Sequence, residues 1–301
     1  MRDQMHDHHQ LGNPVDGGIG SFSDMWSPSV ILITILFLIL YFALTGPLRH
    51  RFSDSSPANG KQKTSFILSM LVFYAGAGSP INFVGHHYLF SMHMLQMALL
   101  FFVLPPLLMV SIPGWLWAVI FRNQKVNAVL RFFTKPIVAA VVFNAFLSFY
   151  HVPFILDFAS LNHNAMNAFH VFLFFTAFCM WWPIIAPLPH GEAQLVGLKK
   201  MAYLFANGIL ITPACALIIF AGEPVYNHYI NAPQIFNDYT PFMDQRLGGI
   251  LMKLVQEVTY GFVLAHIFKK WRQEEKQNDL PMDQQDHSLS VLSPATDQSR
   301  V

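Results

Sequence analysis

The chain has 301 residues, of which 53% are apolar and only 12% are charged, and its net charge is +1. Soluble domains carry about 25% charged residues, so this composition argues against an ordinary cytosolic enzyme and against a disordered chain, and the near-zero charge gives no basic field for nucleic acid. The two cysteines, Cys179 and Cys215, both lie in apolar runs and supply no disulfide framework.

Seven apolar runs are each close to the ~20 residues that a helix needs to cross the ~30 Å core of a bilayer. In chain order they are 28–47, 65–80, 87–110, 136–151, 163–186, 199–221 and 246–268. Only a helix satisfies its own backbone groups in lipid, so the sequence predicts an all-α, polytopic membrane helical bundle of about seven transmembrane helices. The run 112–121 is short and contains Pro-Gly near its start, so we expect an interfacial or re-entrant segment there; an eighth span is the alternative.

Positive residues predict the orientation of the bundle. Fifteen of the 18 Lys and Arg residues fall on one side, in the loops 48–64 and 111–135, at the start of the sixth span and after the seventh. Such residues stay on the cytoplasmic side of a membrane. We therefore expect a cell-membrane protein with its N-terminus outside and its C-terminus inside. Its parts would be an extracellular polar tail (1–27), a seven-span membrane domain (28–268) and a cytoplasmic charged tail (269–301).

The third predicted span carries histidines at a helical spacing. With this topology, ten of the 14 histidines lie outside or in the outer half of the membrane. His86 and His93 are seven residues apart, so we expect them to share one face of that span. Met97 lies on the same stripe and Met94 on its flank.

The fifth predicted span repeats this pattern. His163 and His170 are also seven residues apart, and Met166 lies between them on the same face. Both spans run from outside to inside, and seven residues of helix rise about 10 Å. The pattern therefore predicts two tiers of imidazoles, with His86 and His163 near the outer interface and His93 and His170 deeper.

Imidazole and thioether groups together suit copper, above all Cu(I), which prefers soft ligands, and polar groups inside a bilayer are usually functional. We therefore predict an outward-facing copper site on these two faces. Its core is His93, Met97, His163 and His170, and its supporting residues are His86, Met94 and Met166. Two alternatives remain open at this point. The histidines could simply hydrogen-bond neighbouring helices, with Met as a core filler, or two of them could bind one haem iron axially.

Two further features also leave alternatives open. Lys253 and Glu257 are four residues apart within the seventh span and either neutralise each other or belong to an ion or proton path. The histidine-rich run at 5–9 could capture an exterior metal or bind metal only incidentally.

Three segments carry strings that together resemble the motifs of one protein family. The string SMHMLQM at 91–97 is similar to the family's HMxQH segment, and PFMDQRLGGILM at 241–252 is similar to its DQxxGG segment. The stretch 163–182 resembles its histidine-rich span that closes on tryptophan. With these three segments, the chain resembles the multi-span CtaG-type (Bacillus-type) cytochrome c oxidase assembly factors, and the resemblance covers roughly residues 28–268.

The chain departs from the family pattern at two places. Met97 stands where many members have His, and no carboxylate lies between His163 and His170. Both departures favour Cu(I) over zinc or another metal that prefers hard ligands.

The resemblance implies a role in the biogenesis of a haem–copper cytochrome c oxidase at the plasma membrane. The implied partners are oxidase subunits within the lipid bilayer, with no nucleic acid and no enzyme activity. Copper delivery or insertion is the implied chemistry. The alternatives are a haem-binding membrane oxidoreductase and a metal-free structural scaffold for the oxidase.

The DQxxGG-like segment has its own expected roles. Asp244 and Gln245 could orient a ligand histidine, or Asp244 could cap the start of the seventh span. Gly248 and Gly249 are expected to let a neighbouring helix pack closely.

Overall fold

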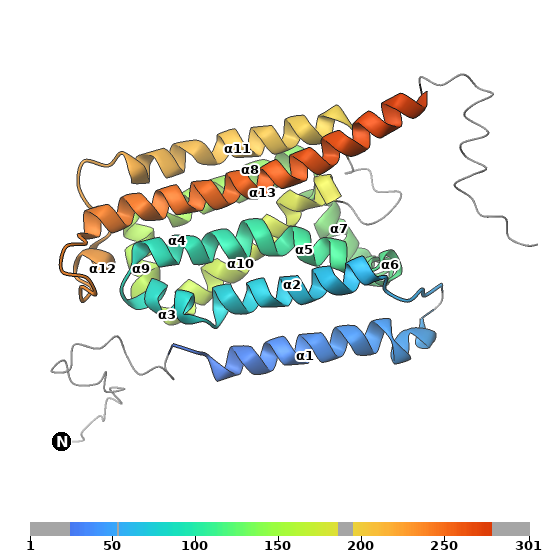
Figure 1. Cartoon of the computed structure of the whole chain (residues 1–301), viewed down its shortest axis with the longest axis horizontal. Coiled ribbons are helices and arrows are strands. Elements are labelled where there is room, and N and C mark those ends of the chain that lie inside the picture. The colour runs from blue at the N-terminus through green and yellow to red at the C-terminus, as the bar shows by residue number, and fades with distance from the viewer. Residues whose placement is uncertain (1–24, 53, 186–194, 279–301) are drawn as a thin grey trace, which may run out of the picture.

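The computed structural model describes residues 25–52, 54–185 and 195–278, and over these ranges the chain is helical without a strand (Figure 1). The predicted all-α bundle is confirmed. Within the described ranges, six helical segments are long and apolar enough to cross a membrane, and a seventh is added if one bent helix pair counts as a span. The predicted tails lie largely outside the described residues, as does the histidine-rich run at 5–9.

The helices of membrane length are α1 (Pro28–Thr45), α2 (Gly60–Ala77) followed by α3 (Pro80–His87), α4 (Phe90–Ala98) followed by η2 (Leu99–Val103) and α5 (Leu104–Ser111), α10 (His163–Ile185), α11 (Leu198–Ile219) and α13 (Pro241–Asn278). The shorter elements are η1 (Pro47–Arg51), α6 (Gly114–Phe121), α7 (Gln124–Phe133), α8 (Pro136–Tyr150), α9 (Pro153–Leu161) and α12 (Asn227–Ile230).

Five segments form a ring around the apolar core. The segment α4–η2–α5 packs against α13, α13 against α11, α11 against α8, α8 against α10, and α10 returns to α5. Large side chains fill the interior, among them the fully buried Phe102, Phe143 and Trp181. Outside the ring, α2 packs on α5 and α1 packs on α2 (Figure 1). The outer helix α1 leaves Leu32 and Ile39 more than half exposed, as expected of side chains that face lipid.

The backbone hydrogen-bond pattern of the third predicted span changes in its middle. Its helix passes through the π-helical turn η2 just before Pro105 and Pro106. Proline has no N–H to donate and its ring clashes with the carbonyl four residues earlier, so the regular hydrogen-bond ladder is interrupted there. The span still continues from Phe90 to Ser111.

One prediction about this region is wrong. We expected His86 and His93 to lie on one helix, but His86 belongs to α3 and a break at Tyr88 and Leu89 separates it from α4. The reason is that the start of α4 is capped by a carboxylate from a distant helix, Asp244, which fixes a helix N-terminus at this point.

The fourth span is the bent one. Helix α8 matches the predicted run 136–151 but has only 15 residues, and it reaches membrane length only together with α7, from which it bends by 76°. The neighbouring α6 has eight residues, too short to cross a bilayer, in agreement with an interfacial or re-entrant segment at 112–121.

Lys253 and Glu257 on α13 form an ion pair, which agrees with the first of the two alternatives that the sequence left open. Lys253 Nζ lies 2.6 Å from Glu257 Oε1. The same ammonium also donates to the carbonyl of Gly208 and to Thr212 Oγ1, both on α11. The pair therefore ties α13 to α11.

Candidate functional site

Three imidazoles meet at one end of the bundle. His86 comes from the end of α3, His93 from α4 and His170 from the first half of α10. The ring centroids of His86 lie 5.9 Å from those of both other histidines, and the His93 and His170 centroids lie 6.0 Å apart with the rings inclined by 26°. His93 is fully buried, and the other two are partly buried. The structure thus forms a single triangle of imidazoles, hereafter the histidine cluster, in place of two tiers.

A tyrosine hydroxyl lies within the histidine cluster. Tyr150, the last residue of α8, is fully buried, and its hydroxyl lies 3.3 Å from His93 Nε2 and 3.4 Å from His170 Nε2. It donates to Met166 Sδ at 2.9 Å. Three side chains from two helices, α4 and α10, therefore converge on the Tyr150 oxygen, with the third imidazole, His86, beside them.

The ring nitrogens of the cluster have unequal partners. His86 Nδ1 donates to the carbonyl of Asn82 at 2.8 Å, so its Nε2 carries the lone pair. The side chain of Asn82 is in turn held by Gln96 Nε2 at 2.8 Å. Nδ1 of the buried His93 has no hydrogen-bond partner in the part of the chain that the structure describes. A buried polar atom without a hydrogen-bond partner lowers the stability of the fold by about 1–3 kcal/mol. This nitrogen is therefore free to accept a further partner.

The segment around α12 holds α3 in place. Tyr229 donates its hydroxyl hydrogen to the carbonyl of Gly85 at 2.9 Å, and His228 Nε2 donates to the carbonyl of His86 at 2.9 Å. Asp157 anchors α12 by accepting from the backbone N–H groups of Asn227 and His228. Burial raises the pKa of Tyr229 well above its ordinary value, so this phenol stays a donor.

Gly85 allows α3 to approach α4 at backbone distance. A methyl group at this position would lie 2.8 Å from the backbone nitrogen of His93, a distance that real Cβ atoms do not adopt. The absence of a side chain at Gly85 is therefore what brings His86 close to His93.

Asp244 caps α4 from across the bundle. Its carboxylate accepts hydrogen bonds from the backbone N–H groups of Phe90 at 2.6 Å and Ser91 at 3.1 Å, and Tyr239 donates to it at 3.3 Å. Among the described residues, its carboxylate has no hydrogen bond to its own helix or to a histidine; instead it fixes the helix on which His93 lies one turn further along. The carboxylate thus acts on the cluster through the position of α4.

The other residues of the DQxxGG-like segment join helices. Gln245 accepts from the backbone N–H of Val225 at 2.8 Å and donates to the carbonyl of Ile218 at 3.2 Å. A methyl group at Gly248 would lie 2.6 Å from the Phe90 ring, and one at Gly249 would lie 2.7 Å from Ile219. The two glycines therefore permit close packing of α13 on α4 and on α11, as the sequence suggested.

Three predicted ligands lie outside the histidine cluster, although His163 is close enough to His86 to interact with it electrostatically. His163 is exposed at the first residue of α10 and makes no ring contact with the cluster within the described ranges. Met94 is fully buried beside Gly248, and Met97 is fully buried in the core. Of the seven predicted ligands, the structure gathers His86, His93, His170 and Met166.

Sequence reasoning missed Tyr150 and the polar residues that position the cluster. Tyr150 is the last residue of α8, and tyrosine is common near either membrane interface, so its type carried no specific signal. Asn82 and Tyr229 lie outside the two helical faces that the spacing singled out. Only the packing of α3, α8 and α12 around α4 and α10 reveals their contacts.

The donor set suits a soft metal ion, although the present arrangement is a hydrogen-bonded one. Over residues 25–52, 54–185 and 195–278, no group of three or more His, Cys, Asp or Glu side chains is arranged to hold a metal ion. The Tyr150 hydroxyl lies between two of the imidazoles. Three neutral imidazoles and a thioether are nevertheless ligand types that Cu(I) accepts, and a His86 Nδ1 bond to a carbonyl is the usual support of a ligand histidine.

Comparison with known proteins identifies one family. Residues 39–274 match the family model described as cytochrome c oxidase caa3 assembly factor (Caa3_CtaG). No curated protein and no solved structure gives a significant match.

Proposed function

The chain belongs to the cytochrome c oxidase caa3 assembly factor family, and from this we propose that it serves oxidase assembly by holding Cu(I) at the histidine cluster and passing it to an oxidase subunit. The residues that would hold the ion are His86, His93, His170 and Met166. The observation that carries the proposal is the convergence of the three imidazoles from three separate helical segments, together with Nδ1 of His93, which is buried and has no hydrogen-bond partner among the described residues.

The chemistry of the cluster suits transfer rather than permanent retention. Neutral imidazole and thioether ligands stabilise Cu(I) without adding negative charge, whereas anionic thiolates would hold it more tightly. The two cysteines, Cys179 and Cys215, lie elsewhere and are buried and free. A copper ion at the cluster would therefore be released readily to a recipient with stronger ligands.

The position of the cluster suits a membrane partner. The charge distribution predicts that this end of the bundle faces the outside of the cell membrane. Apolar side chains remain exposed on the outward faces of the ring helices, for example Leu217 on α11 and Phe262 on α13, and would meet lipid or another membrane protein. We propose lateral contact with the oxidase subunits that receive copper, and no catalytic activity.

The proposal is tested by the copper content of the purified full-length chain and by oxidase activity in its host. The double variant His93→Ala/His170→Ala should lose bound copper and lower oxidase activity while remaining in the membrane. The matched control is His50→Ala/His87→Ala, which removes two histidines outside the cluster and should keep both properties. Full oxidase activity in the cluster variant would reject the site.

The same preparation separates the alternatives. A Soret band in the optical spectrum would identify a haem protein. A chain that contains neither copper nor haem, and whose cluster variant still supports the oxidase, would be a metal-free scaffold. Either result contradicts the copper proposal while leaving the family membership intact.

A further inference from the structure

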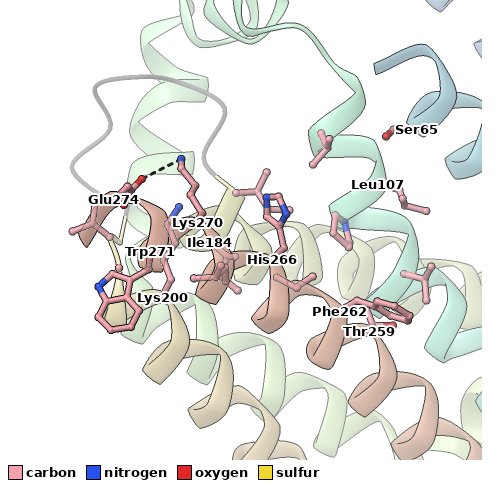
Figure 2. Close-up of a pocket in the computed structure, with 18 residues that line it drawn as sticks. Ser65, Leu107, Ile184, Lys200, Thr259, Phe262, His266, Lys270, Trp271 and Glu274 are labelled. Carbon is pink, nitrogen blue, oxygen red and sulfur yellow. Dashed lines mark ion pairs between the residues drawn. The ribbon is translucent and has the colours of Figure 1, made fainter. Parts of the chain in front are cut away.

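A large cavity opens at the end of the bundle opposite the histidine cluster. Its volume is about 660 Å³, and it lies between α5, the end of α10, the start of α11 and the second half of α13 (Figure 2). Cavities of about 300–1,000 Å³ are the usual size of binding sites for small amphiphilic molecules. This cavity is independent of the histidine cluster and of the function proposed for it.

The walls of the cavity are apolar and reach the lipid-facing surface. Val103, Leu107 and Val110 line it from the α4–α5 segment, and Phe262 and Val263 line it from α13. Val110 is 50% exposed and Phe262 is 75% exposed. In a membrane these two side chains would meet acyl chains, so the cavity is continuous with the bilayer and accessible from the side.

The opposite part of the cavity is basic. Lys200 from α11 and Lys270 from α13 both line it, and Figure 2 shows them close to Trp271 and Glu274. The side-chain ammonium of Lys200 makes no hydrogen bond or ion pair with any described residue. Lys270 pairs only loosely with Glu274 at 3.8 Å, and both of these side chains are more than half exposed, so the pair holds Lys270 weakly.

The indole of Trp271 also lines the cavity, beside the two lysines. Gly197 adopts a φ of +50°, and a methyl group there would lie 3.2 Å from the Trp271 ring. Only glycine adopts this left-handed backbone conformation without strain, so the chain can pass close beside the indole. Trp side chains favour the level of the lipid headgroups, which places this part of the cavity at the membrane interface.

We propose that the cavity binds one anionic phospholipid. An acyl chain would lie along the wall formed by Leu107, Val110 and Phe262, and the headgroup phosphate would lie between Lys200 and Lys270. Basic pockets between membrane helices on the cytoplasmic side recognise such headgroups, and the positive residues predict that this end faces the cytoplasm. A free inorganic anion would use the lysines but leave the lateral apolar opening without a role.

The test uses the full-length chain reconstituted in nanodiscs of phosphatidylcholine with a small fraction of phosphatidylglycerol that has the same acyl chains. The protein is then extracted, and native mass spectrometry counts the lipids that remain bound to it. We expect preferential retention of one phosphatidylglycerol. Each lysine near an anionic headgroup contributes roughly fivefold, so Lys200→Gln/Lys270→Gln should lower this preference about 25-fold. The matched control is Lys199→Gln/Lys269→Gln, since these lysines are exposed neighbours in sequence that do not line the cavity.

Two further variants separate the cavity from general surface charge. Glu274→Gln removes the competitor of the phosphate for Lys270 and should raise the retention of phosphatidylglycerol. Leu107→Trp fills the apolar wall and should lower it with all lysines intact. Equal retention of the two lipids, or equal losses in the cavity variant and the control variant, would overturn the proposal, as would displacement of the bound lipid by inorganic phosphate alone.

Discussion

Replacement of Asp244 by alanine is the perturbation whose effect follows most directly from the structure. The carboxylate is almost completely buried and accepts two backbone hydrogen bonds at the start of α4, from Phe90 and Ser91. The Asp244→Ala variant leaves both N–H groups without this partner in a place that water does not reach easily. The first turn of α4, which leads directly to His93, should then fray.

Two limits bound the loss of unfolding free energy that Asp244→Ala should cause. Hydrogen bonds to a charged group contribute about 1.5–3 kcal/mol each, which gives an upper limit near 6 kcal/mol for the pair. A helix cap in an exposed setting is worth about 0.5–2 kcal/mol. Because removal of Asp244 also relieves the cost of burying its carboxylate, we expect a loss of about 3 kcal/mol in the free energy of unfolding. Asp244→Asn keeps one acceptor oxygen and should lose about half as much.

The assay is reversible unfolding of the purified chain in mixed micelles, followed by circular dichroism, together with copper content at a fixed protein concentration. Asp238→Ala is the control, because Asp238 is exposed in the loop before α13 and should change the unfolding free energy by less than about 0.5 kcal/mol. If Asp244→Ala unfolds like this control, the cross-bundle cap does not stabilise α4 and the reasoning is refuted.

Three other predictions concern the histidine cluster. Gly85→Ala should separate α3 from α4 and lower copper retention at least tenfold, as measured by dialysis against a Cu(I) chelator. Gly261→Ala should leave copper retention unchanged, because a methyl group at Gly261 meets nothing within 4 Å. Equal retention in the two variants would contradict the claim that Gly85 lets α3 approach α4. Tyr150→Phe should lower the free energy of unfolding in mixed micelles by about 1–2 kcal/mol, since the imidazoles lose their shared hydroxyl partner. If Tyr88→Phe lowers it by as much, the Tyr150 hydroxyl does not stabilise the cluster. His163→Ala should retain copper, because this side chain is exposed outside the cluster; a loss of copper, measured by elemental analysis, would favour the ligand set predicted from the sequence.

The membrane architecture was accessible from the sequence because each long apolar run has only one way to satisfy its backbone groups in lipid. The ends of the spans were less predictable. Helix α13 begins at Pro241 and continues to Asn278, beyond the apolar run 246–268, because polar residues extend a helix without altering the hydropathy signal that defined the span. The bend between α7 and α8 depends on packing and left no comparable signal.

The candidate site shows where helical spacing stops being informative. His93 and His170 do face each other, as two matched helix faces suggested. His86 joins them by a different route, since the chain breaks at Tyr88 and Leu89 and Gly85 lets α3 lie against α4. That break depends on Asp244, which lies more than 150 residues away in the sequence. No periodicity within one segment can report such a contact.

The most direct test of the central claim is X-ray absorption at the copper edge on the purified, Cu(I)-loaded chain. The account predicts a first coordination shell of imidazole nitrogens with one sulfur, and loss of the sulfur contribution in Met166→Leu. A shell without imidazole scattering, or a spectrum that His93→Ala and His170→Ala leave unchanged, would contradict the claim that the histidine cluster holds the metal.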